Sequence, residues 1–274
     1  MMKKNIESIE LAKLIRKSVL MMTSLGMSSH VGSCLSIADI VAVLYSDELH
    51  IDANDPHKYD RDRLILSKGH AGAALYSALA YKGFFSEKIL STHYQNGSFL
   101  SGHVSHKEIP GVEISTGSLG HGLSIGCGFA YGSKIAKENW RTYVIISDGE
   151  CNEGSVWEAA LFAGHHKLSN LCVLLDYNKL QSIKSTKETL DLEPIEDKWL
   201  SFGWDVERTS GHDHVSLNKS LNNLKLSSKP GIIICDTIKG KGVSFMENKV
   251  LWHYKSPSES DLAQAIKEID KDER

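Results

Sequence analysis

The sequence is poor in cysteine and proline, and each shortage excludes a class of protein. Its five cysteines are odd in number and widely spaced, which fits neither a disulfide framework nor a Cys-x-x-Cys metal or redox site. We therefore predict that they are buried as small apolar residues. Five prolines and 22 glycines in 274 residues are too few for a collagen-like chain, and 41% hydrophobic residues are too many for a disordered one.

Long apolar runs and an excess of positive charge are missing as well. Apolar stretches such as residues 143–146 and 171–175 are far shorter than the roughly 20 residues that cross a bilayer. The N-terminus turns polar and acidic after two lysines, whereas a secretory signal needs an apolar core. With 31 basic and 34 acidic residues, the chain has no electrostatic footprint for nucleic acid or an anionic membrane. We expect a cytoplasmic protein that binds neither.

The sequence does contain an alternation of strand and helix patterns. Val, Ile and Leu occupy consecutive positions in residues 142–147, 170–176 and 230–236, as in strands buried on both faces. Helical spacing predicts helices over residues 7–25, 70–82, 120–137, 153–167, 195–202, 214–226 and 258–269. The alternation predicts an α/β fold with a mainly parallel sheet, helices on both faces and ligands at the carboxyl ends of the strands. We expect a single domain over residues 1–274.

Several boundaries also follow from local signals. Gly26 is expected to end the first helix in a left-handed conformation. Residues 36–39 have capping-box-like spacing, with Asp39 in place of Glu, and predict the start of a second helix. Residues 50–63 read as a polar loop, and the glycines of residues 120–137 are expected to let that helix approach the sheet closely.

An acid and an amide leave the ends of two of the predicted strands. Asp148 follows the 142–147 strand, and Asn178 follows the 170–176 strand. Mg²⁺ prefers oxygen ligands, and these two side chains with a nearby backbone carbonyl would supply three. The alternative is two ordinary strand-to-helix turns, because Asp-Gly and Asn-Lys pairs form turns in many proteins. Spacing alone leaves both interpretations open.

Seven segments between residues 10 and 255 resemble motifs of the transketolase family, in the family's order. Residues 148–159 and 170–181 resemble its thiamine diphosphate signature, which usually begins Gly-Asp-Gly and ends in a metal-binding Asn. The others are SHVGS at 29–33, SKGH at 67–70, GHV at 102–104, TGSLGHG at 116–122 and TIKGKGVSFME at 237–247 with WH at 252–253. The departures from the family pattern are Ser147 for Gly, Ser29 and Val31 for Gly and Pro, and His121 for Gln.

The resemblance implies a thiamine diphosphate-binding fold and the N-terminal, pyrophosphate-binding subunit of a split transketolase. Such an enzyme uses thiamine diphosphate and Mg²⁺ to transfer a two-carbon glycolaldehyde unit from a ketose, usually phosphorylated, to an aldose. The implied partner is a separate C-terminal subunit that binds the aminopyrimidine ring and without which the chain is inactive. We expect the two chains to form an α2β2 heterotetramer.

The resemblance also implies roles for individual residues. Asp148, Asn178 and the carbonyl of Leu180 should hold Mg²⁺ against the diphosphate. Besides that acid and amide, the implied cofactor-binding residues are Gly117, Leu119, Gly120, Gly122, Gly149, Glu150, Gln181 and Lys239, with Lys68 as a further candidate to offset the diphosphate charge. The implied catalytic residues are His30, His70, His103 and His253 around the thiazolium ring, and Glu153 at the subunit interface.

Histidines suit this chemistry because imidazole titrates near neutral pH, where protons must move on and off sugar hydroxyls. Any one of the four, taken alone, would be interpreted as an ordinary buried or surface histidine. Other histidines, at positions 103 and 106, 165 and 166, and 212 and 214, suggest zinc, but no Cys or Glu completes a tetrahedral set. Asp213 is instead predicted to cap the following helix.

Other functions remain in competition. The α subunit of a 2-oxo acid dehydrogenase shares a Gly-Asp-Gly to Asn signature. Decarboxylation of a 2-oxo acid, however, does not require several histidines that hydrogen-bond to sugar hydroxyl groups. A transketolase-like subunit that acts on modified sugars fits the changes around His30. A non-catalytic subunit would have lost the metal ligands, and Asp148 and Asn178 are both present.

Overall fold

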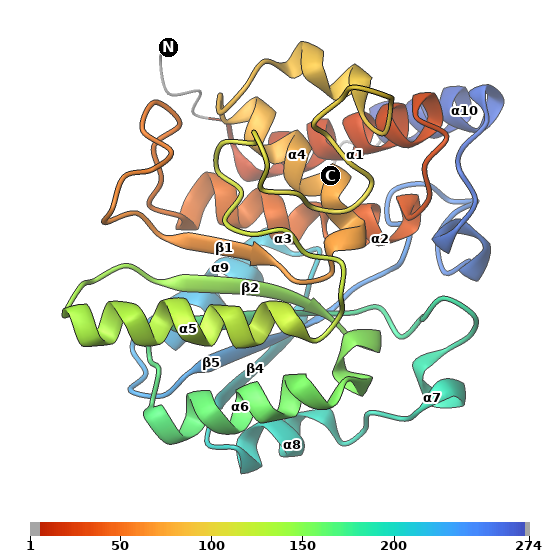
Figure 1. The fold of residues 1–274 in the computed structure, drawn as a ribbon. Coiled ribbons are helices and arrows are strands. Elements are labelled where there is room, and N and C mark those ends of the chain that lie inside the picture. The colour runs from red at the N-terminus through yellow and green to blue at the C-terminus, as the bar shows by residue number, and fades with distance from the viewer. Residues whose placement is uncertain (1–5, 272–274) are drawn as a thin grey trace.

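A computed structural model describes residues 6–271, so both ends of the predicted 1–274 domain lie outside the described residues. Five strands form one sheet in the order β1-β2-β3-β5-β4, and all its neighbouring strands run parallel (Figure 1). The strands are β1 (Arg63–Leu66), β2 (Thr142–Ser147), β3 (Leu171–Tyr177), β4 (Asp205–Ser210) and β5 (Gly231–Asp236). The predicted parallel α/β sheet is confirmed.

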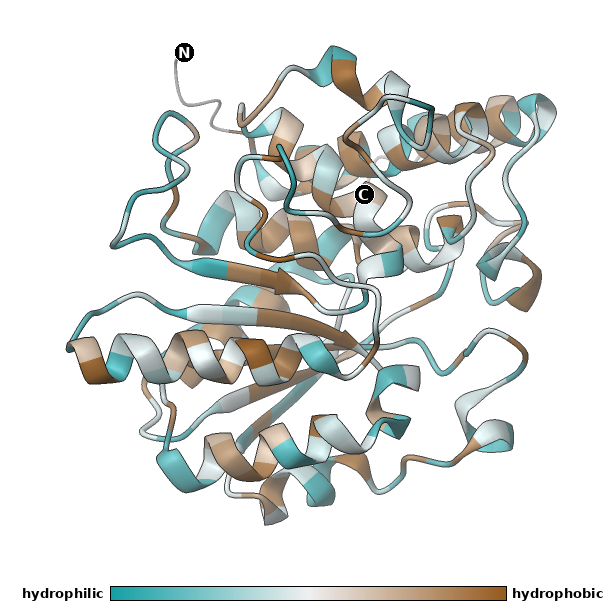
Figure 2. Cartoon of the chain, in the orientation of Figure 1, coloured by the Kyte–Doolittle hydropathy of each residue, from teal (hydrophilic) through white to brown (hydrophobic). Residues whose placement is uncertain are grey.

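Helices cover both faces of the sheet, as expected from the consecutive apolar residues in its central strands. One face of the sheet meets a core built from α1 (Ser8–Leu25), α2 (Val31–Ser36), α3 (Ala38–Val43), α4 (Gly72–Tyr81), α9 (His214–Lys225) and α10 (Glu259–Lys271), in which α9 lies directly on β4 and β5. The other packs against α5 (His121–Ala136), α6 (Gly154–His166) and α8 (Ile195–Ser201). Successive residues of one strand enter opposite cores: Tyr143 and Ile145 face the first, and Val144 and Ile146 the second. Figure 2 shows apolar residues on the strands and on the helices, where they alternate with hydrophilic residues.

Short elements occupy the connections between these layers. They are the π-helical turn Leu44–Glu48, the helix α7 (Thr186–Thr189), and the 3₁₀ turns Gly69–Ala71, Glu87–Thr92, Gly149–Asn152 and Val250–His253. Three of the 3₁₀ turns, Gly69–Ala71, Gly149–Asn152 and Val250–His253, overlap motif segments, so these parts of the motifs lie in connections that the sheet holds in place. Functional loops on a rigid α/β scaffold are the usual arrangement.

The two strands that the sequence pattern did not predict are the edges of the sheet. β1 is short, and its first residue, Arg63, closes the predicted polar loop over 50–63. β4 is polar, and its residues are half-buried or exposed. An edge strand needs neither the length nor the continuous apolar run of a central strand, so the pattern used for the other three does not detect it.

Two helix boundaries differ from expectation. Gly26 has φ −78°, in the right-handed region, and the left-handed residue is Met27 with φ 48°. The predicted capping box at 36–39 is wrong, because the hydroxyl of Ser36 donates to Asp176 and α3 starts without a side-chain cap. Asp39 instead binds Arg16 through both carboxylate oxygens. Tertiary partners therefore take both side chains that the local spacing assigns to a cap.

Close packing of α5 on the sheet is confirmed at Gly126, where a Cβ atom would lie 2.5 Å from a methyl carbon of Val144. The prediction of close approach is wrong at Gly128 and Gly132, where an added Cβ would meet nothing within 4 Å.

All five cysteines are free and buried, as predicted. Within residues 6–271, no helix is both long and apolar enough to cross a membrane.

Candidate active site

A cavity of about 240 Å³ opens at the carboxyl ends of β2 and β3. Its walls come from loops far apart in the sequence, which the parallel strands bring to one edge of the sheet. The lining residues are His30, Ser33, Lys68, His70, His103, Gly117, Leu119, Ser147, Asp148, Gly149, Asn178, Leu180, Gln181, Ser182, Lys239, His253 and Tyr254.

The predicted acid and amide lie together in this cavity, and both are buried. The Asp148 carboxylate accepts the backbone N–H of Gly149 at 2.7 Å and of Lys179 at 2.6 Å. The amide oxygen of Asn178 accepts the N–H of Leu180 at 3.0 Å. Burial, and then the charge of Asp176, raise the pKa of Asp148 to about 7. A cation bound here would favour its ionised form.

Two lysines, which as isolated residues would be expected in solvent, are buried in the cavity wall. Lys239 has 2% of its surface exposed, and its ammonium donates to the carbonyls of Leu180 and Gln181 at 3.0 and 3.2 Å. It also lies 2.9 Å from Nδ1 of His253. Burial, and then the charge of Lys68, lower the pKa of Lys239 to about 8. Within the described residues no carboxylate lies within ion-pair distance of this ammonium, so Lys239 is available to bind an anion in the cavity.

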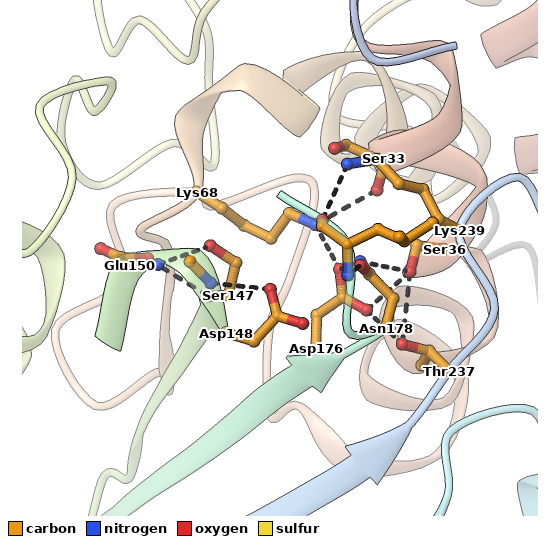
Figure 3. A network of polar contacts seen from close by, with 12 residues as sticks. Ser33, Ser36, Lys68, Ser147, Asp148, Glu150, Asp176, Asn178, Thr237 and Lys239 are labelled. Carbon is orange, nitrogen blue, oxygen red and sulfur yellow. Dashed lines mark hydrogen bonds and ion pairs between the residues drawn. The ribbon is translucent and has the colours of Figure 1, made fainter. Parts of the chain in front are cut away.

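Asp176 is the centre of a polar network that sequence reasoning did not assign to the site (Figure 3). Its side chain is fully buried and forms an ion pair with Lys68. It also accepts hydrogen bonds from Ser36 at 2.6 Å and from the amide nitrogen of Asn178 at 3.0 Å. Burial raises the pKa of Asp176, but the Lys68 ammonium and these hydrogen bonds outweigh it and lower the pKa overall. Because Asp176 holds the amide nitrogen, the Asn178 oxygen points the other way.

Four histidines from four separate loops meet in the cavity around His30. The ring centroid of His30 lies 5.0 Å from that of His253, 5.1 Å from His70 and 5.5 Å from His103. His30 has φ 75°, and its Nδ1 lies 2.7 Å from the hydroxyl of Ser29. That contact fixes the ring and leaves Nε2 without a partner in the described part of the chain.

Three histidines of the cluster, His30, His70 and His253, are neutral at physiological pH. Burial, and then His103 and the two lysines, lower the pKa of His30 to about 4. Burial, and then Lys239, lower the pKa of His253 to about 3, and the pKa of His70 is shifted in the same direction by burial and Lys68. Neutral imidazoles each carry one donor and one acceptor nitrogen, so the cluster can hydrogen-bond to hydroxyl and carbonyl groups of a ligand.

Four of the predicted site residues lie outside the cavity wall. Gly120 donates its backbone N–H to Glu150 at 2.8 Å, and a Cβ on Gly122 would lie 2.4 Å from the Cβ of Ser67. Glu150 is fully buried behind the wall, where it also accepts from the hydroxyl of Ser67. These three brace the loop that carries Gly117 and Leu119. Glu153 is exposed at the start of α6.

The remaining histidines have structural partners. His212 and His214 both contact the Asp39 carboxylate, at 2.7 and 3.1 Å. Asp213 accepts the backbone N–H groups of Val215 and Ser216 and so caps α9, as predicted. No cluster of three or more His, Cys, Asp or Glu suited to a metal occurs among residues 6–271.

Some cavity residues were not predicted: Ser33, Ser182 and Tyr254, besides the buried Asp176. Tyr254 directly follows the Trp-His motif, and Ser33 ends the SHVGS segment, so their positions offered a signal. The role of Asp176 depends on partners 108 and 140 residues away, and only the folded chain shows them.

Comparisons with known proteins agree with this geometry. The family model for the transketolase thiamine diphosphate-binding domain matches residues 8–272. The chain is 38% identical to one of the subunits of the apulose-4-phosphate transketolase of Phocaeicola vulgatus, over 96% of this chain and 94% of that protein. It is 42% identical to a 6-deoxy-6-sulfo-D-fructose transketolase subunit of a Clostridium species, over 89% of each.

A solved structure, the transketolase of Campylobacter jejuni, superimposes with a TM-score of 0.89 at 30% identity. The match covers 96% of this chain but only 42% of that one, so the chain spans less than half of a single-chain transketolase. The match confirms the fold expected from the sequence motifs. The chain belongs to the transketolase family, in which it is a thiamine diphosphate-binding domain.

Proposed function

We propose that this chain is the diphosphate-binding subunit of a two-subunit transketolase. One observation carries the proposal: four histidines share a single cavity with the oxygens of Asp148 and Asn178 and the buried ammonium of Lys239. A diphosphate with a divalent cation suits one end of this cavity, and a polyhydroxylated substrate suits the other. The two relatives named above act on sugars according to their names.

The donor set fits a cofactor made of a diphosphate and Mg²⁺. Asp148, Asn178 and the Leu180 carbonyl offer a carboxylate, an amide and a carbonyl oxygen, which are the ligands that Mg²⁺ prefers. Lys239 offers a positive charge that lacks a carboxylate partner among the described residues, and the backbone of Gly117 and Leu119 lines the same space. We assign these residues to holding thiamine diphosphate and Mg²⁺.

The chain's own contribution to the reaction is to bind and orient the sugar and to move its protons. When bound, thiamine diphosphate supplies the electron sink that cleavage of a ketose C2–C3 bond requires. His30, His70 and His253 are neutral, so each can accept a proton from a sugar hydroxyl or donate a hydrogen bond to it, and His103 lies beside them in the cavity. Ser29 sets the ring of His30 for this role.

The substrate we propose is a ketose donor, phosphorylated or otherwise modified, with an aldose acceptor. The names of two relatives give apulose-4-phosphate and 6-deoxy-6-sulfo-D-fructose as their sugars, and both are modified ketoses. The replacement of two residues beside His30 relative to the family pattern fits a specialised sugar. A small-molecule carbohydrate is therefore the substrate class, with no nucleic acid involved.

The partner we propose is a separate pyrimidine-binding chain, arranged with this one as α2β2. Supporting this, α5 and α6 lie side by side and present large apolar side chains to solvent. These are Ile125, Ile135, Leu161 and Phe162, with exposures of 39%, 66%, 59% and 39%, and we call them the α5–α6 face. Exposed apolar patches mark protein interfaces. Glu153 begins α6 beside this face and is a candidate contact to the partner's side of the cofactor.

A cytoplasmic location belongs to the same proposal, because the five thiols are unpaired and disulfides are rare in that compartment. The rival function, decarboxylation of a 2-oxo acid, gains no support from the relatives described above, which are transketolases.

The experiment that tests the proposal is a transfer assay. This chain alone, and together with the pyrimidine-binding chain from the same genome, is given thiamine diphosphate, Mg²⁺, a ketose phosphate and an aldose phosphate. We expect two-carbon transfer only with both chains. Oxidation of pyruvate with an artificial electron acceptor, and no ketose turnover, would instead establish the dehydrogenase function.

A further inference from the structure

Tyr254 is a cavity residue that neither the sequence motifs nor the cofactor assignment explains. It directly follows the 3₁₀ turn Val250–His253 and lines the cavity beside the histidine cluster. Its ring centroid lies 4.6 Å from that of His253 and 5.9 Å from that of His30, with the rings tilted by 65° and 64°. The tyrosine ring therefore contacts both imidazoles edge to face.

The backbone around Tyr254 is held firmly, although its side chain is 64% exposed. The carbonyl of His253 accepts the backbone N–H of His30 at 2.8 Å, and the ring of His253 lies 2.9 Å from the ammonium of Lys239. The backbone N–H of Tyr254 donates to the carbonyl of Leu251. Backbone hydrogen bonds therefore hold this segment in place, and the ring of Tyr254 is exposed where it lines the cavity.

The hydroxyl of Tyr254 has no hydrogen-bond partner among residues 6–271. A phenol has a donor and an acceptor, and its ring offers a large apolar surface at a low cost in side-chain entropy. Lys239, Asp148 and Asn178 are more than nine-tenths buried, at the strand ends, so the exposed Tyr254 marks the outer end of the same cavity. A ligand that extends from the histidines toward solvent passes this ring.

We infer that Tyr254 is a specificity-determining residue that contacts the carbon chain of the sugar beyond its reacting carbonyl. The inference rests on the proposed transketolase function. The ring packs against the C–H groups of the sugar, and the hydroxyl hydrogen-bonds to a sugar hydroxyl group. A two-carbon acceptor is too short to reach the ring, whereas longer aldoses touch it.

The test uses the enzyme assembled from both chains with thiamine diphosphate and Mg²⁺, and hydroxypyruvate as a fixed donor. kcat/KM is measured for glycolaldehyde, glyceraldehyde 3-phosphate and ribose 5-phosphate. Tyr254→Phe should lower kcat/KM about 3- to 10-fold for the two longer acceptors, mainly through KM, as expected for one neutral hydrogen bond. Tyr254→Ala should lower it further, and glycolaldehyde should change less than about twofold in either variant.

Tyr59→Ala is the matched control, because this tyrosine is similarly exposed (61%) but lies outside the cavity. It should leave every acceptor unchanged. An equal loss for all three acceptors in the Tyr254 variants, or their dissociation from the partner in sedimentation, would overturn the inference and leave the proposed function standing. A wild-type assembly that transfers no two-carbon unit to any acceptor would overturn both.

Discussion

The Asp148 carboxyl group is poised between its charged and neutral forms. Its surroundings supply two backbone N–H donors, yet burial and the neighbouring Asp176 carboxylate raise its pKa to about 7. A site that tolerates the charge poorly when empty is stabilised by a cation that completes it. The proposed Mg²⁺ would favour the charged form of this carboxylate.

We expect Asp148→Ala and Asn178→Ala to weaken Mg²⁺-dependent binding of thiamine diphosphate by at least ~100-fold, or roughly 2.8 kcal/mol. Each removes an oxygen from a shell that the remaining residues cannot refill. Calorimetric titration of both variants in the presence of the partner chain measures the effect. Asp197→Ala, an exposed carboxylate on α8, serves as the control. Wild-type affinity in either site variant would contradict the assignment.

The neutral histidines predict that the chain loses stability on acidification. The unfolded chain binds protons at an imidazole pKa near 6.5, but folded His30 and His253 resist protonation down to about 4 and 3. The unfolded state therefore binds more protons between pH 6.5 and these values, and the free energy of unfolding falls as pH falls through that window. Because the rings are partly exposed, each histidine contributes less than the limit of about 1.4 kcal/mol per pH unit.

Urea unfolding between pH 7.5 and 4.5 measures this slope. His30→Gln removes one titrating ring and should flatten the dependence, whereas the exposed His57→Gln should not. An identical slope in wild type and His30→Gln would show that His30 does not titrate as described.

At the scale of elements, the loop that carries Lys239 is anchored from the opposite side by His212. The backbone N–H of Ile238 donates to Nε2 of His212 at 2.8 Å, so Nδ1 carries the proton and donates to Asp39 at 2.7 Å. Asp39 is in turn held by Arg16 of α1. A chain of contacts therefore links α1 and α3 to the position of Lys239 in the cavity.

His212→Ala should destabilise the chain by about 1–3 kcal/mol, because the N–H of Ile238 loses its acceptor, and should weaken thiamine diphosphate binding. His212→Gln keeps a donor and an acceptor and should restore much of both. His214→Ala is the control, since this ring also binds Asp39 but makes no contact with Ile238. Urea unfolding and calorimetry give the two readouts. Unchanged cofactor affinity in His212→Ala would refute the anchoring role.

Strands that helices cover on both faces could be predicted from sequence. Elements whose ends depend on contacts with residues far away in the chain could not. The strands β2, β3 and β5 are buried on both faces, so their apolar runs are continuous. β4 lies at the edge, where polar residues are tolerated. The break between α2 and α3 escaped prediction because Ser36 and Asp39 bind residues 140 and 23 positions away.

In the candidate active site, the sequence motifs likewise predicted some features and missed others. The motif positions include Asp148, Asn178 and the four histidines, and the fold brings all six into one cavity. Motifs also marked Gly120 and Glu150, but these support the wall and do not line it. A motif identifies residues that matter to a site without distinguishing contact from support.

At the scale of the whole molecule, the α5–α6 face predicts the surface that the partner covers. Leu161→Glu places a charge in that face and should weaken association with the partner at least ~100-fold, because a buried unpaired charge costs several kcal/mol. The isolated chain should keep its stability within about 0.5 kcal/mol, as exposed substitutions usually do. Val215→Glu, exposed on α9 on the other side of the sheet, is the control.

Sedimentation of the mixed chains distinguishes the outcomes. If Leu161→Glu associates as tightly as wild type while Val215→Glu does not, the partner lies on the opposite side of the molecule. In that case the surface assignment is wrong, although the cavity assignment is unaffected.

The helix α5 joins two regions that have so far been treated separately. It begins at His121, immediately after the loop whose Gly117 and Leu119 line the cavity, and it carries Ile125 and Ile135 on the α5–α6 face. Restraining this helix at one end restrains the loop at the other. Thermodynamic linkage then requires reciprocity. If binding of the partner raises the affinity for the diphosphate by some factor, binding of the diphosphate raises the affinity for the partner by the same factor. A coupling of this kind would be measured as assembly with the proposed partner that depends on the concentration of the cofactor.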